Sequence, residues 1–169
     1  MVSTVRAAFV GLALIGCSAH AGAQAAAQAL AAADRVQFIK VIARDYVFDA
    51  PATVQAGIAT IQLVNQGADI HHLTVQELPA GRTVKEFFDA TRVGRAPSWS
   101  RSLGQTATIA NGTETFISFR MPPGRYILSC IIPASDGRSH VAKGMYQLIT
   151  ATAGPVAATA PRPPAPRRP

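Results

Sequence analysis

Cysteine, methionine, histidine and tryptophan are scarce in this chain of 169 residues, which holds two, three, four and one of them, respectively. No nucleophile–base pair and no glycine-rich phosphate loop stands out, and this lack argues against an enzyme. No basic run is interleaved with aromatic residues, so the sequence gives no support for a nucleic-acid partner. Because so few chemistry-bearing residues are present, their positions along the chain decide the functional interpretation.

The N-terminus lacks a hydrophobic run long enough to span a bilayer. The apolar stretch after Arg6 covers residues 7–16 only, against the roughly 20 residues that a spanning helix needs. A basic residue followed by a short apolar run is typical of an export signal, which we place at residues 1–23. Cleavage after Ala21-Gly22-Ala23 would release a soluble protein, whereas the lipobox Leu14-Ile15-Gly16-Cys17 would leave a lipid anchor on Cys17. Both alternatives predict a location outside the cytoplasm, in the periplasm or envelope of a bacterium.

Composition divides the rest of the chain into three parts. Residues 24–35 are rich in alanine and glutamine and form a predicted tether, and residues 151–169 form a Pro/Ala/Arg-rich tail. Such a tail buries too little apolar surface to fold, so we expect disorder there, as a solvated spacer or as a polyproline II ligand for a partner. Residues 36–150 remain as one domain, which we expect to be monomeric and large enough for a hydrophobic core. Four of the seven net positive charges come from arginines in the signal and the tail, so the domain is only mildly basic.

Short β-strand patterns dominate residues 36–150. Segments rich in Val, Ile, Phe and Thr recur with turn signals between them, which is typical of a β-sandwich. Asn111-Gly112 is a hairpin signal between two such segments. Val84 to Thr91 has a 3.6-residue apolar face and predicts one short helix, and residues 92–105 are expected to form a loop. The predicted fold class is therefore all-β, a sandwich of seven to eight strands with one short helix in a connecting loop. The predicted strands cover residues 36–43, 46–54, 58–64, 73–75, 106–109, 115–119, 126–132 and 145–150.

One thiol stands out once the signal is set aside. Cys17 is removed or lipidated, which leaves Cys130 without a disulfide partner in an exported protein. Such a thiol is expected to be buried, reactive or metal-bound. His140 and Met145 follow it closely, and the pair His71-His72 lies far upstream. Thiolate, imidazole and thioether groups suit copper, and two His, one Cys and one weak axial Met make up a blue-copper electron-transfer site.

Strand alternation separates the two adjacent histidines. His71 lies on the apolar strand face together with Leu73, whereas His72 lies on the polar face, because neighbouring residues in a strand point to opposite sides. His71 is therefore the better ligand candidate, and His72 is the alternative, expected to meet solvent or a loop. The same alternation turns Cys130 towards the interior at the end of its strand. The turn signal Asp136-Gly137 would then return the chain, and with it the second imidazole, to Cys130.

Four features of the sequence belong together: the stretches Asp45–Gly57, Leu63–His71 with its histidine six residues after Asn65, and Pro123–Cys130, and the spacing of His140 and Met145. Together they resemble the cupredoxin (plastocyanin/azurin) family over residues 38–150. The resemblance implies a Greek-key β-sandwich with one mononuclear copper ion, Cu(I) or Cu(II), at one end and one-electron shuttling between partners outside the cytoplasm. The implied ligands are His71, Cys130, His140 and Met145. The chain departs from the family in the nine residues that separate Cys130 from His140, where members typically have fewer, and in His72, a second imidazole beside His71.

Three functions remain open from the sequence. The first is an electron carrier that exchanges electrons with a redox partner protein. The second is a copper delivery or resistance protein that passes its ion to a copper acceptor, although the chain has no Met/His-rich run of the kind that scavenges copper. The third is a metal-free β-sandwich that acts as an interaction module. An enzyme is not expected, because an axial Met145 leaves no open metal position for a substrate.

Overall fold

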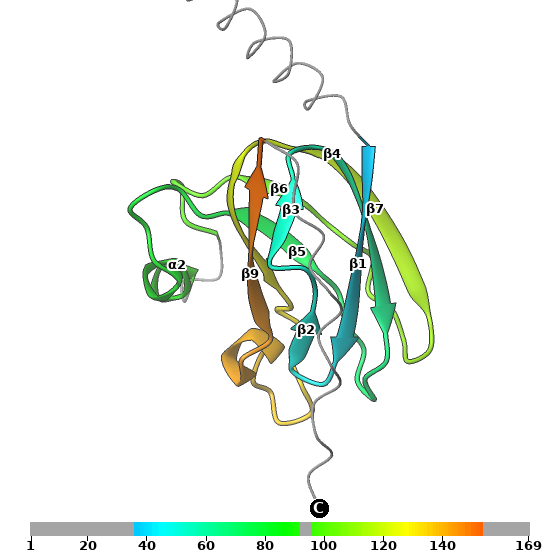
Figure 1. Cartoon of the computed structure of the whole chain (residues 1–169). Helices are drawn as coiled ribbons and strands as arrows, with labels where there is room; N and C mark the ends of the chain where they lie inside the picture. The colour runs from blue at the N-terminus through cyan, green and yellow to red at the C-terminus, as the bar shows by residue number, and fades with distance from the viewer. Residues whose placement is uncertain (1–35, 92–95, 154–169) are drawn as a thin grey trace, which may run out of the picture.

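Two β-sheets packed face to face form the body of the protein in the computed structural model, which describes residues 36–91 and 96–153 (Figure 1). The predicted export signal, the tether and nearly all of the tail lie outside these residues, so those predictions stay predictions. Among the described residues, no helix is long and apolar enough to cross a membrane.

The first sheet has four strands and contains the parallel pair that opens the domain. β1 and β4 run parallel over eight residue pairs, and β7 lies antiparallel on the other side of β4. Every second residue of β4 is buried, because alternate side chains of a strand point to the same face. The strand order is β2 (Val47–Asp49), β1 (Val36–Arg44), β4 (Gly57–Asn65) and β7 (Glu114–Met121).

The second sheet has five strands and delivers two of the predicted metal ligands. β8 is its central strand, antiparallel to β5 and to β9. Cys130 follows β8 directly, and Met145 directly precedes β9, so the pairing of these two strands brings both residues to the same end of the sandwich. The strand order is β3 (Thr53–Gln55), β9 (Tyr146–Thr152), β8 (Gly124–Ser129), β5 (Thr74–Glu77) and β6 (Ser102–Gln105).

The hydrophobic core fills the space between the two sheets. Ile61 and Leu63 of β4 face Tyr126 and Leu128 of β8, and all four are fully buried. Burial of this much apolar surface is the main force that holds the sheets together. The same core cluster reaches Cys130 and Met145, so the predicted ligands lie at the edge of a packed interior.

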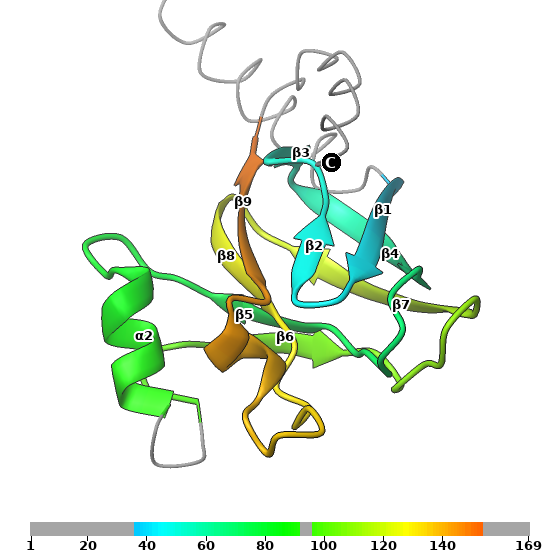
Figure 2. The same ribbon diagram turned by 90° about the horizontal axis from the view of Figure 1, so that it is seen from below.

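The predicted helix is confirmed as α2, which spans Val84–Thr91. Its start is fixed by a capping box, in which Thr83 Oγ1 accepts the Glu86 N–H while the Glu86 carboxylate accepts the Thr83 N–H; such a box satisfies two donors that the first turn leaves free. The helix stands beside the second sheet (Figure 2). Phe87 packs there in a second, smaller cluster with Leu78, Ile127 and Trp99.

Several details of the predicted strands differ in the structure. The described residues form nine strands, and the Pro51 break splits the expected strand 46–54 into β2 and β3. The segment 92–105, expected to be a loop, contains β6. Residues 106–109 contribute only a single bridge, from Ile109 to His71, and β7 pairs with β4. Asn111-Gly112 still makes a turn, with Gly112 at φ 74°, but this turn passes the chain between the sheets instead of joining two neighbouring strands.

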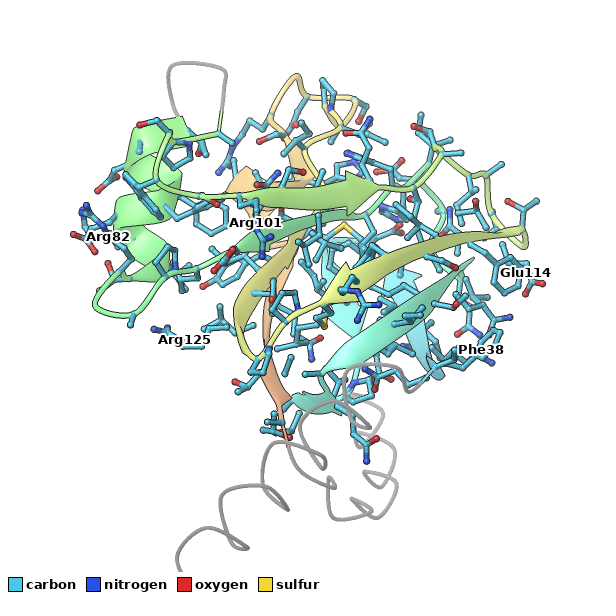
Figure 3. All side chains as sticks on the ribbon, turned by 90° about the horizontal axis from the view of Figure 1, so that it is seen from above. Phe38, Arg82, Arg101, Glu114 and Arg125 are labelled. Atoms are coloured by element: carbon cyan, nitrogen blue, oxygen red, sulfur yellow. The ribbon has the colours of Figure 1, made fainter. Side chains whose placement is uncertain are left out.

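Charged side chains are spread over both sides of the sandwich. Figure 3 shows Arg82 and Arg125 on the side of α2, and Phe38 and Glu114 on the opposite side. Phe38 is 73% exposed on the outer face of β1. The described surface therefore shows the mixed character expected from the modest charge of the domain.

Candidate metal centre

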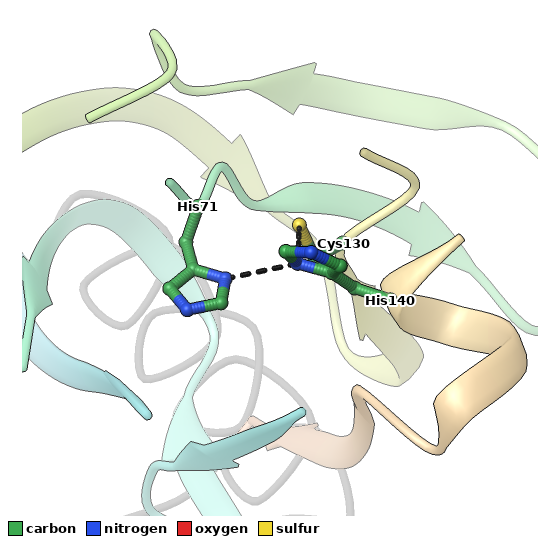
Figure 4. A group of neighbouring side chains, drawn as sticks. All are labelled: His71, Cys130 and His140. Carbon is green, nitrogen blue, oxygen red and sulfur yellow. Dashed lines mark hydrogen bonds between the residues drawn. The ribbon is translucent and has the colours of Figure 1, made fainter. Parts of the chain in front are cut away.

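The loops at one end of the sandwich, at the bottom of Figure 1, bring three of the predicted ligands together. His71 lies between β4 and β5, Cys130 ends β8, and His140 begins the short 3-10 helix η1 (His140–Lys143). Their side chains converge on one point (Figure 4). Each of the three is at most 1% exposed, so the cluster is closed to bulk water.

The distances between the donor atoms fit a single metal ion. His71 Nδ1 lies 3.1 Å from His140 Nδ1, and Cys130 Sγ lies 3.5 Å from His140 Nδ1. The three donor atoms all lie within 4.8 Å of one another. An ion bonded to imidazole nitrogen at about 2.0–2.1 Å and to thiolate sulfur at about 2.3 Å holds its ligand atoms roughly 3 to 4 Å apart. The His-Cys-His group therefore fits a type 1 copper site.

His71 is held by contacts that are distant in sequence. It exchanges two backbone hydrogen bonds with Ile109, at 3.0 and 2.8 Å. The buried side-chain amide of Asn65 donates to the carbonyls of Asp69 and Ile109, and its oxygen accepts the Gly67 N–H. Asn65 thus ties together three segments around His71, which explains why an asparagine six residues ahead of the histidine belongs to the motif.

The nine residues between Cys130 and His140 form a closed excursion. Pro133 and Ser139 pair as a bridge, and Ala134 and Gly137 make the bonds of a tight turn between them. The His140 N–H then donates to the Ile132 carbonyl at 2.8 Å. Because the extra length closes on itself, it leaves His140 beside Cys130, and the longer gap does not separate the two donors.

Comparison with known proteins agrees with this architecture. No protein-family model and no curated protein matches the chain. Reduced auracyanin from the photosynthetic bacterium Roseiflexus castenholzii matches with 18% identity and a TM-score of 0.50, over 68% of this chain and 96% of that one. Auracyanin A from Chloroflexus aurantiacus, described as a "blue" copper protein, matches with 14% identity and a TM-score of 0.50, over 70% and 100% of the two chains.

The chain has the cupredoxin fold. At these identities the likeness establishes the architecture alone, and it confirms the predicted β-sandwich. The ligand roles of individual residues in this cupredoxin fold rest on the geometry of the chain itself.

Met145, the predicted axial ligand, lies beside the other donors along the backbone. It is fully buried and shares the core cluster with Cys130. Its N–H donates to the His140 carbonyl at 2.9 Å, and its carbonyl accepts the Cys130 N–H at 3.2 Å. The backbone therefore ties Met145 to both neighbouring donors, while its axial role stays a prediction.

His72 occupies a different position from the one expected. The sequence placed it towards solvent or a loop, but it is only 6% exposed. Its Nδ1 lies 3.4 Å from Cys130 Sγ. It is not part of the group in which His71, Cys130 and His140 approach one another. His72 therefore lies against the sulfur, and the structure brings His71, not His72, into the converging set.

Three residues that the sequence did not single out cover the outer side of the imidazoles. Asp45 Oδ1 lies 3.3 Å from His71 Nε2, and Asp69 Oδ2 lies 3.7 Å from His140 Nε2, which is buried without a hydrogen bond. The Tyr46 ring packs edge-on against the His140 ring at 5.2 Å, and its hydroxyl donates to Asp69 at 3.1 Å. Asp45 and Tyr46 were visible only at the start of a stretch that resembles the cupredoxin family, so no sequence signal marked this role.

Burial shifts the pKa of several ionisable groups at the centre. It raises the pKa of the Cys130 thiol, although the N–H groups of His72 and Ile132 point at the sulfur and oppose this rise. Burial also lowers the pKa of His72 and of His140, with the nearby His71 as a further cause for both. Neutral imidazoles are ready to bind a cation, and a bound metal deprotonates a coordinating thiol.

Proposed function

We propose that this protein is an exported copper protein that carries one electron at a time. The observation that carries the proposal is the convergence of His71, Cys130 and His140 into one buried group. Two imidazoles and one thiolate, with a weak axial thioether from Met145, are the ligand set of electron-transfer copper sites. Copper bound there would supply the one-electron Cu(II)/Cu(I) couple.

The protein's own contribution is to hold these side chains in one arrangement. Asn65 and Ile109 fix His71 from the sandwich, and the backbone bonds around Met145 fix the other donors. A centre held this firmly changes little between two oxidation states, which suits a carrier. All four predicted ligands are at most 1% exposed, so ions and water are excluded; this favours retention of copper over delivery to an acceptor.

We propose a working place outside the cytoplasm and a redox partner protein. The proposed location follows from the export signal predicted at residues 1–23, with either a soluble form or a lipid anchor at Cys17. The mildly basic domain would favour an acidic partner surface. We propose no enzymatic activity, because Met145, as the predicted axial ligand, would leave no open metal position for a substrate.

The decisive experiment is a visible and EPR spectrum of the copper-loaded full chain. We expect an intense thiolate-to-Cu(II) charge-transfer band that Cys130→Ala abolishes. Ser129→Ala is the matched control, because Ser129 is the buried neighbour of Cys130 and bonds to Thr74; it should retain the band.

Two outcomes would contradict the proposal. A colourless protein that binds copper and releases it to an acceptor would indicate copper delivery. An unchanged melting temperature on copper addition would indicate a metal-free module, because a ligand that binds only the folded state must raise stability.

A further inference from the structure

The ring of His72 lies against the sulfur of Cys130, and the copper function has so far given this contact no role. His72 Nδ1 is 3.4 Å from Cys130 Sγ. His72 is only 6% exposed, and Cys130 is fully buried. The contact is therefore shielded from bulk water, and a hydrogen bond in such surroundings is stronger than the same bond in solvent.

The positions of the donor atoms separate His72 from the predicted ligands. His71, Cys130 and His140 offer atoms that all lie within 4.8 Å of one another, and His72 is not part of that group (Figure 4). An ion shared by the three would meet Cys130 directly and His72 only through the sulfur. His72 is therefore a positioning residue that acts through Cys130, and it is not a further ligand.

A bound metal decides which atom of the His72–Cys130 pair donates. Because a metal deprotonates a coordinating thiol, the sulfur then offers lone pairs and no proton. An imidazole Nδ1 is a donor in one neutral tautomer and an acceptor in the other. Two acceptors that face each other in a buried place repel, so the metal-bound centre favours the tautomer of His72 that carries its proton on Nδ1.

The backbone holds the His72 ring at this place. The preceding residue, His71, exchanges two backbone hydrogen bonds with Ile109, so the chain is fixed at the point from which the His72 side chain starts. The backbone N–H groups of His72 and Ile132 also point at the sulfur. On its other sides Cys130 belongs to the apolar core cluster. The His72 ring thus adds a side-chain donor to a sulfur that otherwise faces backbone donors and apolar groups.

We propose that His72 donates a hydrogen bond from Nδ1 to the metal-bound sulfur of Cys130 and thereby raises the reduction potential of the centre. The thiolate carries more negative charge beside Cu(I) than beside Cu(II), so the bond is stronger in the reduced state. Hydrogen bonding around the cysteine sulfur is one of the factors that set the potential of such copper sites. The effect on the potential rests on the proposed function, whereas the hydrogen bond itself does not.

The hydrogen bond is tested on the zinc-loaded full chain. Zn(II) takes thiolate and imidazole ligands and has no redox chemistry, so this experiment is independent of electron transfer. Proton–nitrogen correlation NMR distinguishes the two ring nitrogens of a histidine. We expect a proton on Nδ1 of His72 that exchanges slowly with water, and His72→Asn identifies its signals by removing them.

The effect on the centre is tested on the copper-loaded full chain with two substitutions. His72→Phe keeps a ring but removes the donor. At a fixed applied potential, its ratio of reduced to oxidised protein should fall about three- to tenfold, the equivalent of part or all of one hydrogen bond. Its thiolate-to-Cu(II) band should move to longer wavelength, because the thiolate becomes a better electron donor. His72→Asn, whose amide N–H can take the place of Nδ1–H, should restore most of both properties.

Thr74→Val is the matched control. Thr74 is as buried as His72, at 6% exposure, but its hydroxyl bonds to Ser129 and not to the sulfur. Loss of this hydroxyl removes a buried hydrogen bond two residues along the chain. The reduction ratio and the position of the band should stay the same.

The outcomes separate this proposal from the copper function. A normal blue band whose position and reduction ratio are the same in His72→Phe would overturn the role of His72 and leave the electron carrier standing. A zinc-loaded protein without a proton on Nδ1 would also overturn it, and this result needs no substituted protein that folds. An Nδ1 proton in the zinc form of a protein that shows no blue band with copper would support the hydrogen bond and sink the electron carrier. A chain that binds neither ion would overturn both proposals.

Discussion

The two halves of the metal centre are built on different principles. His71 is fixed by two parts of the chain that are far apart in sequence, since Asn65, Gly67 and Asp69 from one part and Ile109 from the other bond to it or to its supports. Cys130, His140 and Met145 belong to one loop, and their backbone bonds connect that loop mainly to itself. The difference indicates that the sandwich determines the position of the first histidine, whereas the loop forms a self-contained unit that tolerates changes in length.

Gly67→Ala is expected to displace His71 and so to disrupt its half of the centre. A Cβ at this position would lie 2.7 Å from His71 Nε2 and 2.9 Å from the Asp45 nitrogen, and closer still to Asp45 Oδ1. We expect a loss of about 2–3 kcal/mol in the free energy of unfolding, typical of overpacking, together with weaker copper binding. Denaturant unfolding and copper titration measure both quantities.

Gly137→Ala is the control for that substitution in the loop half. Gly137 has a φ of 78° and no atom near its missing Cβ, so alanine should cost only about 1 kcal/mol of backbone strain. The visible spectrum should stay the same. Equal loss of copper binding in the two variants would contradict the contrast between the halves.

Asp45→Asn is expected to raise the reduction potential of copper bound at the centre, and it tests the His71 half. The carboxylate 3.3 Å from His71 Nε2 favours Cu(II) over Cu(I), so its neutralisation should raise the potential. Because the Asp45 side chain is 40% exposed, the effect should be at most about 1 kcal/mol, or about 40 mV for one electron. Cyclic voltammetry measures it, and Asp89→Asn on α2 removes the same charge as a control. A fall in potential, or an equal rise in the control, would show that Asp45 does not act on the centre.

Shortening the excursion is expected to have the smallest effect. An Asn-Gly turn in place of residues 134–138 would join Pro133 to Ser139, which already pair. The bond from the His140 N–H to the Ile132 carbonyl can persist, so the blue band should remain and stability should change by less than about 1 kcal/mol. Loss of the band on shortening would show that the excursion itself positions His140.

The loop half of the centre was more accessible from sequence than its surroundings. Local signals, namely the spacing of His140 and Met145 and the Asp136-Gly137 turn, describe a segment that bonds mainly to itself. Alternation in a strand correctly placed His71 on the inner side. It failed for His72, because the chain leaves the regular strand before Thr74 and both histidines become buried.

The residues that cover the outer side of the two imidazoles could not be predicted from the sequence, for a physical reason. Tyr46 sits in an aromatic, β-like stretch, yet it adopts a φ of 64° in the turn between β1 and β2. Its contact with Asp69 and His140 exists only after two distant loops meet. The same holds for β7, whose choice of β4 over the nearer segment 106–109 depends on which apolar face the core accepts.

The burial of all four predicted ligands has a kinetic consequence. An ion enclosed by side chains that are at most 1% exposed can escape only when the protein opens locally. The rate of metal exchange with external chelators would then be limited by the rate at which the loop between Cys130 and Met145 opens. It would not depend on the affinity or the concentration of the chelator. Such a protein would retain its metal ion for a long time in the presence of strong chelators, even where equilibrium favours release of the ion.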